Sequence, residues 1–497
     1  MKVLMDVRNH GSGSNSILKM FIAIILIITM TSFNYKDFIV ESNPDDMYEY
    51  LILNKYKKID NINIDYKKEL TQEKFINQVK AVRDFMNENQ CFYELGNKEE
   101  ITRKFNELLE KPEGHTIEDL QLELMKIMTN YKQGHITTYN TSNDKYLPII
   151  IGSYKNKYYI IASEKEYSEL LGSEILKINN IPIQEIKDKV SKYVSYENDT
   201  FKNIKTINYM NCYNILEKEK IVNSNEIKIT INSGKITTYK LPVKNTKNKS
   251  VTQVIMDSGN DIVFPNISQK YFNNFEKIKP LNKTYFTDKL FYTEGKGDNL
   301  IIRYNSCTEN DKYKIDEFTK EIFQKLDSHK YKNIIFDLRY NTGGDSRLLI
   351  PIILKVKAYN REIYRSNIKV LIGKSTYSSA GDNSLHILRY IDDVEVIGEN
   401  GGFPINTGSG NMNTFYLKDT YIISTYCKTV FFNDYTLEDV CNHNYRNYDF
   451  NENMMTPDFR AEQSFADYMI GNDPAMNYAL RDEGNNSLID RIKDIFN

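Results

Sequence analysis

The second half of this 497-residue chain alternates short apolar runs with helical patterns, and this alternation restricts the fold more than any other feature. The apolar runs lie at residues 299–304, 333–339, 368–372 and 394–397. The run at 333–339 is almost continuously apolar, as expected of a strand buried on both faces of a sheet. Helical patterns follow three of the runs, at residues 315–326, 346–357 and 380–390. Repeated strand–helix units predict an α/β core.

The first half of the chain shows two other sequence patterns. Residues 67–131 place apolar side chains such as Phe75 and Val79 at helical spacings among charges, which predicts a small helical domain. Residues 147–243 contain short β-type runs separated by Asn, Gly, Ser and Lys, which predict a β-rich middle domain. The polar stretch 244–251 lacks periodicity and is expected to be a linker. Several domains are expected in any case, because this length exceeds what one core supports.

The N-terminal apolar segment has the layout of an export signal. Residues 20–35 carry no charge and follow Arg8 and Lys19. The apolar run is shorter than the ~20 residues of a membrane-spanning helix. We therefore expect residues 1–35 to be a signal peptide, with an uncleaved membrane anchor as the alternative and a buried helix as a weaker one. The expected location is extracellular or at the cell surface.

Composition excludes several classes of function. Lys and Arg total 65 against 67 Asp and Glu, so no basic excess exists to neutralise a phosphate backbone, and nucleic acid is not an expected partner. Five cysteines lack any Cys-x-x-Cys pair, so neither a structural zinc site nor a redox motif is indicated. No metal or cofactor is expected. The cysteines are Cys91, Cys212, Cys307, Cys427 and Cys441.

Two strand-to-helix junctions hold the residues that suggest chemistry. At the first, a buried strand runs into Gly343 and Gly344, whose backbone N–H groups can point into open space beside a helix N-terminus and suit an oxyanion. An ordinary tight turn is the alternative. At the second, Ser378 lies between a strand and a helix, where the helix dipole favours its alkoxide. Taken alone, a serine there is also a common helix N-cap.

Together and in this order, the junctions resemble the tail-specific (C-terminal-processing) serine peptidase family and its tricorn-core relatives. Asp-Leu-Arg-x-Asn-x-Gly-Gly at residues 337–344 resembles the strand signature of that family, and Thr-x-Ser-Ser-Ala at 376–380 resembles its nucleophile turn. The resemblance extends from residue 124 to residue 480. Further matching elements lie at residues 134–137, 396–399, 456–458 and 467–474.

The resemblance implies an α/β fold of several domains, in the broad sense α+β. It places a ClpP/crotonase-like ββα catalytic domain at residues 251–497, after a helical N-terminal domain at 36–146. Residues 172–183 resemble the strand and turn of PDZ domains, so residues 147–250 are expected to form a PDZ-like domain. Such a domain would present an extended peptide by strand addition.

The family uses either a lysine or a histidine as the base for its serine. No lysine lies between Ser378 and Lys418, so a Ser–Lys dyad is not expected. His135 matches the base of the tricorn-like branch, and a neutral imidazole can take the serine proton. A serine precedes the histidine in that branch, but Gly134 does so here, which leaves the tetrad incomplete. The downstream glutamate of the branch is matched most nearly by Glu452.

His443, which lies near Cys441, is the rival to His135 as the base. An unperturbed imidazole predicts a pH–rate profile that rises between about pH 6 and 7. Because His135 would have to reach the catalytic cleft from the helical domain, a chain starting after Leu147 is expected to fold and yet be inactive.

The resulting hypothesis is a secreted serine endopeptidase that hydrolyses polypeptides through an acyl-enzyme on Ser378, with His135 as general base. Backbone N–H groups of Gly343, Gly344 and Ser379 would form the oxyanion hole. A catalytically silent peptide- or ligand-binding protein on the same fold is the main alternative, favoured by the missing lysine and the altered tetrad. An acyl-CoA enzyme of the crotonase type fits neither the export signal nor the exposed serine.

Overall fold

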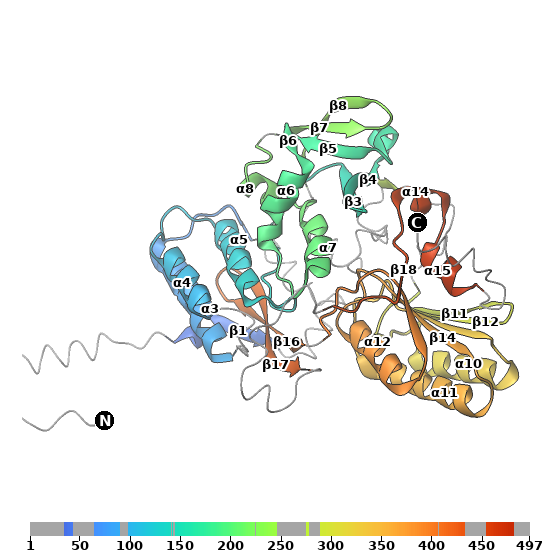
Figure 1. Cartoon of the computed structure of the whole chain (residues 1–497). Coiled ribbons are helices and arrows are strands. Elements are labelled where there is room, and N and C mark those ends of the chain that lie inside the picture. The colour runs from blue at the N-terminus through green and yellow to red at the C-terminus, as the bar shows by residue number, and fades with distance from the viewer. Residues whose placement is uncertain are drawn as a thin grey trace, which may run out of the picture.

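The computed structural model (Figure 1) describes residues 34–42, 64–89, 98–140, 142, 145–223, 225–245, 275–277, 289–405, 407–432 and 454–481. Most of the expected signal segment, and also Cys91, Cys441, His443 and Glu452, lie outside these ranges. Within them, no helix has both the length and the apolar character that a membrane span needs.

The C-terminal part is built on a six-stranded sheet with the order β11-β12-β13-β14-β15-β18. Neighbouring strands from β12 to β18 are parallel, and β11 is antiparallel to β12. The expected strands and helices are present, so the prediction of a mixed α/β fold is confirmed. The strands are β11 (Phe291–Lys296), β12 (Asn299–Tyr304), β13 (Asn333–Asp337), β14 (Asn367–Ile372), β15 (Val394–Gly398) and β18 (Phe459–Arg460).

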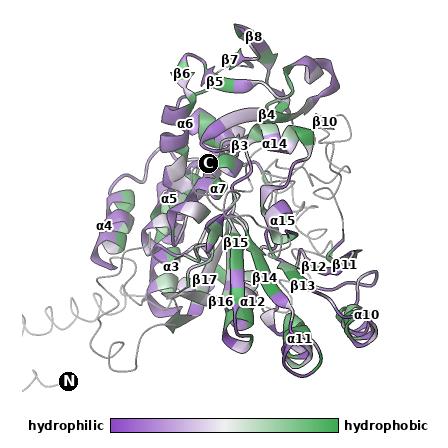
Figure 2. Ribbon diagram, turned by 45° about the vertical axis from the view of Figure 1, so that its right-hand side comes forward, coloured by the Kyte–Doolittle hydropathy of each residue, from purple (hydrophilic) through white to green (hydrophobic). Residues whose placement is uncertain are grey.

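Helices cover both faces of this sheet. The helices α10 (Ile315–Ser328), α11 (Ile350–Glu362) and α12 (Ser379–Tyr390) pack on one face, over buried Ile334 and Phe336. The short helix α15 (Pro474–Ala479) packs on the other face, over Ile335 and Leu371, and α14 (Phe465–Ile470) precedes it. The ribbons of the central strands β13 and β14 are largely hydrophobic in colour (Figure 2), and their residues are buried at nearly every position.

The middle part contains a second, largely antiparallel sheet. Its strand order is β10-β4-β5-β7-β8, with β3 beside β4 and β6 beside β5. Three helices that the β-rich pattern did not predict complete its core: α6 (Ile183–Val190), α7 (Asp199–Tyr209) and α8 (Tyr213–Lys218). The strands are β3 (Ile149–Tyr154), β4 (Lys157–Glu164), β5 (Glu174–Ile178), β6 (Ile181–Pro182), β7 (Glu226–Asn232), β8 (Ile236–Pro242) and β10 (Phe275–Lys277), with a separate pair β2 (Lys145–Tyr146) and β9 (Lys244–Asn245).

The N-terminal helices pack against a hairpin from the far end of the chain. Strands β16 (Thr407–Leu417) and β17 (Ile423–Phe432) form a sheet with β1 (Ile39–Ser42) beside helix α3 (Gln72–Asn89) (Figure 1). The rings of Phe85 and Phe415 are 4.5 Å apart in this core. Helices α4 (Lys98–Leu109) and α5 (Ile117–Met128) complete it. Sequence analysis did not predict the hairpin.

Candidate active site

Ser378 sits in a strained turn immediately before α12. Its backbone angles are φ 52° and ψ −131°, a region that residues with a side chain seldom adopt. The turn is held from both sides. The hydroxyl of Thr376 donates to the carbonyl of Leu338 (2.9 Å) and accepts from the N–H of Gly373 (2.9 Å). The N–H of Tyr377 donates to the carbonyl of Asn341 (3.1 Å), which joins the two junctions predicted from sequence.

Both glycines of the first junction are required by the close approach of backbone. Gly343 and Gly344 have φ angles of 113° and 134°, which a residue with a side chain rarely adopts. A Cβ at position 343 would lie 2.8 Å from the Cβ of Ser378, and one at position 344 would lie 2.3 Å from the carbonyl oxygen of Cys307. Gly343 therefore keeps open the space beside the Ser378 hydroxyl, and Gly344 allows the close approach of the Cys307 carbonyl.

The three expected oxyanion donors are not equivalent. The N–H of Gly343 donates to the side-chain oxygen of Asn341 (2.9 Å), so it is already occupied. Within the described part of the chain, the N–H groups of Gly344 and Ser379 donate no hydrogen bond. The expectation is corrected accordingly: Gly343 contributes the absence of a side chain, and Gly344 and Ser379 are the two available donors.

His135 reaches Ser378 from the N-terminal part of the chain. Its Nε2 lies 3.1 Å from the Ser378 Oγ, although the two residues are 243 positions apart. The loop that carries it follows α5 and forms a bridge to strand β17 through Thr138 and Ser424, whose hydroxyls are 2.8 Å apart. The side chain of His135 is only 16% exposed. The structure thus brings together the expected nucleophile and the expected base.

Two further residues contact the other nitrogen of His135, and sequence analysis missed both. The hydroxyl of Tyr377 lies 3.2 Å from Nδ1 and 3.0 and 3.1 Å from the two carboxylate oxygens of Glu197. Glu197 itself is 3.8 Å from Nδ1 and fully buried. Tyr377 is the variable residue of the Thr-x-Ser-Ser-Ala motif at residues 376–380, which assigns it no role. Glu197 gave no signal, because a glutamate just ahead of the helix N-cap Asn198 has no distinctive pattern.

Burial shifts the ionisation of this group. It lowers the pKa of His135 to about 4, and the positive charge of Lys205 acts in the same direction. Burial raises the pKa of Glu197 to about 7, although hydrogen bonds from the Gly134 N–H and the Tyr377 hydroxyl oppose this. Burial also holds the pKa of Tyr377 well above its usual value. The expectation of an ordinary imidazole pKa for His135 is therefore corrected.

Other motif residues hold the sheet together rather than meeting Ser378. Arg339 donates two hydrogen bonds to Asp473 (2.7 and 2.9 Å) and binds Asp337 as well, all three side chains being buried. This network ties the end of β13 to α15. Asp458 accepts a hydrogen bond from the N–H of Val396 (2.8 Å) and so fixes β18 beside β15. These contacts account for the elements at residues 337–339, 456–458 and 467–474.

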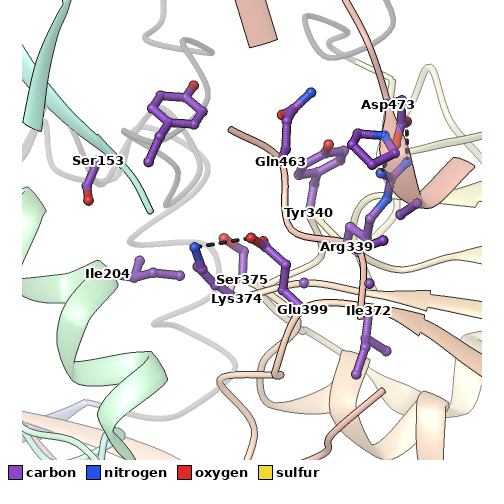
Figure 3. Close-up of a pocket in the computed structure, with 16 residues that line it drawn as sticks. Ser153, Ile204, Arg339, Tyr340, Ile372, Lys374, Ser375, Glu399, Gln463 and Asp473 are labelled. Carbon is purple, nitrogen blue, oxygen red and sulfur yellow. Dashed lines mark hydrogen bonds and ion pairs between the residues drawn. The ribbon is translucent and has the colours of Figure 1, made fainter. Parts of the chain in front are cut away.

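A pocket lies beside the turn that carries Ser378, between the middle sheet and the carboxyl ends of the strands of the six-stranded sheet (Figure 3). Ser153 and Ile204 line it from one side, and Arg339 and Lys374 from the other. Its charged groups are paired, Lys374 with Glu399 (3.1 Å) as Figure 3 shows. Within the described ranges, no group of His, Cys, Asp and Glu side chains is arranged to hold a metal ion.

No family model and no curated protein sequence matches the chain. Mature CPAF complexed with lactacystin matches with a TM-score of 0.56 and 11% identity, covering 86% of this chain and 98% of that one. Mature CPAF alone gives 0.55 and 11%, covering 82% and 96%. The chain has the fold of CPAF, a tail-specific protease.

The match to CPAF extends over nearly the whole of that protein. At 11% identity the likeness to CPAF concerns the fold, and the chemistry of this chain rests on the site described above.

Proposed function

We propose that this chain is a serine peptidase, which hydrolyses peptide bonds through an acyl-enzyme on Ser378 with His135 as general base. One observation carries the proposal: the His135 Nε2 lies 3.1 Å from the Ser378 Oγ, within the range in which a base takes a hydroxyl proton. A fold likeness to a tail-specific protease supports polypeptides as the substrates.

In the proposed reaction, the Ser378 Oγ attacks the carbonyl carbon of the scissile bond while its proton passes to the His135 Nε2. The negative charge on the carbonyl oxygen would be met by the free N–H groups of Gly344 and Ser379. His135 then gives its proton to the leaving amine, and the carbon–nitrogen bond breaks. Water, activated by the same imidazole, hydrolyses the ester and releases Ser378.

The strained backbone of Ser378 argues against a catalytically silent binding protein. Non-glycine residues at positive φ cost free energy, about 1–3 kcal/mol each, and persist where the surroundings impose them. The turn around Ser378 is imposed by Thr376 and Asn341. The strain and the two free N–H groups beside the hydroxyl are features expected of a nucleophile and its oxyanion hole.

A fluorophosphonate probe tests the proposal without knowledge of the natural substrate. We expect the full chain to be labelled at Ser378, as located by peptide mass mapping, and Ser378→Ala and His135→Ala to lose labelling while they unfold at the wild-type temperature. Folded wild-type protein that resists the probe would instead support the binding function. Lactacystin is a second probe, because CPAF has been seen in complex with it.

We also propose that the chain is exported and that the middle domain binds an extended peptide at a strand edge. The uncharged segment 20–35 supports export. Expression of the full chain in a secreting host, followed by sequencing of the mature N-terminus, tests this. A chain retained inside the cell with its first residues intact would contradict export.

A further inference from the structure

We propose that the buried Glu197 carboxylate, acting through the Tyr377 hydroxyl, positions His135 and fixes the imidazole tautomer whose Nε2 lone pair faces Ser378. This inference rests on the peptidase function proposed above. Glu197 comes from the segment ahead of α7 in the middle part of the chain, far from the downstream position where a third catalytic residue was expected. Glu197 and Tyr377 would be positioning residues, since neither touches the reacting atoms.

The geometry places the Tyr377 hydroxyl between two partners. Its oxygen lies 3.0 and 3.1 Å from the Glu197 oxygens and 3.2 Å from the His135 Nδ1. Stacking fixes the phenol ring, because Tyr377 lies between Phe201 (centroids 4.0 Å apart) and the imidazole of His135 (5.0 Å). The hydroxyl therefore cannot turn away without breaking both stacks.

The count of protons then decides the tautomer. A carboxylate only accepts hydrogen bonds, so the single proton of the Tyr377 hydroxyl goes to Glu197. The phenol oxygen can then only accept from His135, which requires the imidazole proton on Nδ1. Nε2 is left with its lone pair toward the Ser378 Oγ, as a general base needs. When His135 becomes an imidazolium during the reaction, Glu197 at 3.8 Å offsets the new charge.

The opposite protonation state gives the opposite tautomer. If Glu197 carries a proton, it can donate to the phenol oxygen and release the Tyr377 proton toward Nδ1. The imidazole proton must then reside on Nε2, where it faces Ser378 and blocks the transfer. The charged group whose field acts on both His135 and Glu197 is Lys205, on α7, and it favours the ionised carboxylate.

Hydrogen bonds around Glu197 favour its ionised form and oppose the effect of burial. The Gly134 N–H donates to the carboxylate, so the residue next to His135 also holds the positioning group. A Cβ at position 134 would lie 2.4 Å from the Glu197 Oε2 and 2.4 Å from the Tyr377 oxygen. The absence of a side chain at Gly134 therefore leaves room for the contact between the Glu197 carboxylate and the Tyr377 hydroxyl. The segment is anchored to the catalytic part by Asn198, whose side-chain nitrogen donates to the Gly402 carbonyl (3.0 Å).

The chain offers a matched control. Tyr146 and Glu164 form a similar pair in the same part of the molecule, with the tyrosine hydroxyl 2.7 Å from the Glu164 Oε1 and the carboxylate nearly buried. This pair lies on β2 and β4 and makes no contact with His135 or Ser378 among the interactions of the described residues. Glu164→Gln and Tyr146→Phe thus reproduce the chemical changes away from the site.

The test compares the second-order rate of fluorophosphonate labelling at pH 8 among full-length variants. We expect Glu197→Gln and Tyr377→Phe each to slow labelling by about 10- to 1,000-fold, below the ~10⁴ lost when a serine triad holds the wrong tautomer. The double variant should be no slower than the slower single one, because the two residues act as one unit. Both control variants should react within about twofold of wild type.

Rates of Glu197→Gln and Tyr377→Phe within about twofold of wild type would overturn the inference. Wild-type protein that is folded but never labelled would instead refute the peptidase function, so the two failures are distinguishable.

A measurement on wild-type protein tests the inference even if a variant does not fold. The six histidines can be labelled with nitrogen-15 and their tautomers assigned by NMR at pH 8, using His135→Ala to identify the signal. A proton on Nδ1 of His135 supports the inference, and a proton on Nε2 overturns it.

Discussion

Thr425 on strand β17 is bonded in both directions to the backbone of Thr137, two residues after His135. The N–H of Thr137 donates to the Thr425 Oγ1 (2.9 Å), and the N–H of Thr425 donates to the Thr137 carbonyl (2.8 Å). The two residues are 288 positions apart. The general base of the proposed reaction is therefore held by a strand that follows the nucleophile in the chain.

Thr425→Val should slow the reaction of Ser378 while preserving the fold. Valine has the shape of threonine but cannot accept the Thr137 N–H, which costs about 1–3 kcal/mol of stability and loosens the loop of His135. Because a small misplacement of a catalytic group can cost up to ~100-fold, we expect fluorophosphonate labelling to fall about tenfold. Thr429→Val, at an exposed position of the same strand, is the control. Equal rates for both variants would show that the loop is held by other contacts.

Gly134→Ala should slow the reaction of Ser378 by disturbing the contact between Glu197 and Tyr377. The added Cβ would collide with the Glu197 carboxylate and the Tyr377 hydroxyl, each 2.4 Å away, and would separate them. We expect labelling to fall by about 10- to 100-fold, with a change in Tm typical of a single substitution. Gly295→Ala is the matched control, because nothing lies within 4 Å of a Cβ there. An active Gly134→Ala protein would show that the Tyr377–Glu197 contact is dispensable.

Much of the six-stranded sheet could be predicted from sequence because its strands are buried on both faces. Strand β13 is buried at every position, and such a run is apolar without alternation. The hairpin β16–β17 could not be predicted, because its buried stretch at residues 423–427 includes the polar residues Ser424 and Thr425, and because β16 pairs with the N-terminal strand β1. Nothing in a local pattern indicates a partner that lies hundreds of residues away.

The candidate site divides in the same way. Ser378 and the two glycines lie in turns whose geometry depends on neighbouring residues, so local patterns reveal them. His135 was found only through a family resemblance, and Glu197 was not found at all, because its partners come from two other parts of the chain.

The structure also changes the expectation for a truncated chain. A chain starting after Leu147 would leave Phe415 and Tyr426 without the helices that bury them, so we no longer expect it to fold.

The pH dependence of labelling should be set by Glu197 rather than by His135. Activity requires an ionised Glu197, whose pKa is about 7, and a neutral His135, whose pKa is about 4. As the pH falls, Glu197 takes up its proton first, so the wild-type rate should decline below about pH 7. In Glu197→Gln this limb should vanish, leaving a lower plateau that declines toward pH 4. Identical limbs in both proteins would assign the transition to His135.

The same titration predicts how stability varies with pH. The pKa of Glu197 is raised by burial from 4.5 to about 7 in the folded protein. Between these values the folded state binds the proton and the unfolded state does not, so stability falls as the pH rises through this window, and the loss is complete above pH 7.

Glutamine at this position cannot ionise, so the stability of Glu197→Gln lacks this loss. At about 1.4 kcal/mol per pH unit, the free energy of unfolding of the variant relative to wild type should rise by roughly 3 kcal/mol between about pH 4.5 and 8.5. Denaturant unfolding at both pH values measures this change, and any constant effect of the substitution cancels. A merely structural glutamate with an ordinary pKa would give a pH-independent difference, and that result would also remove Glu197 as the source of the activity limb.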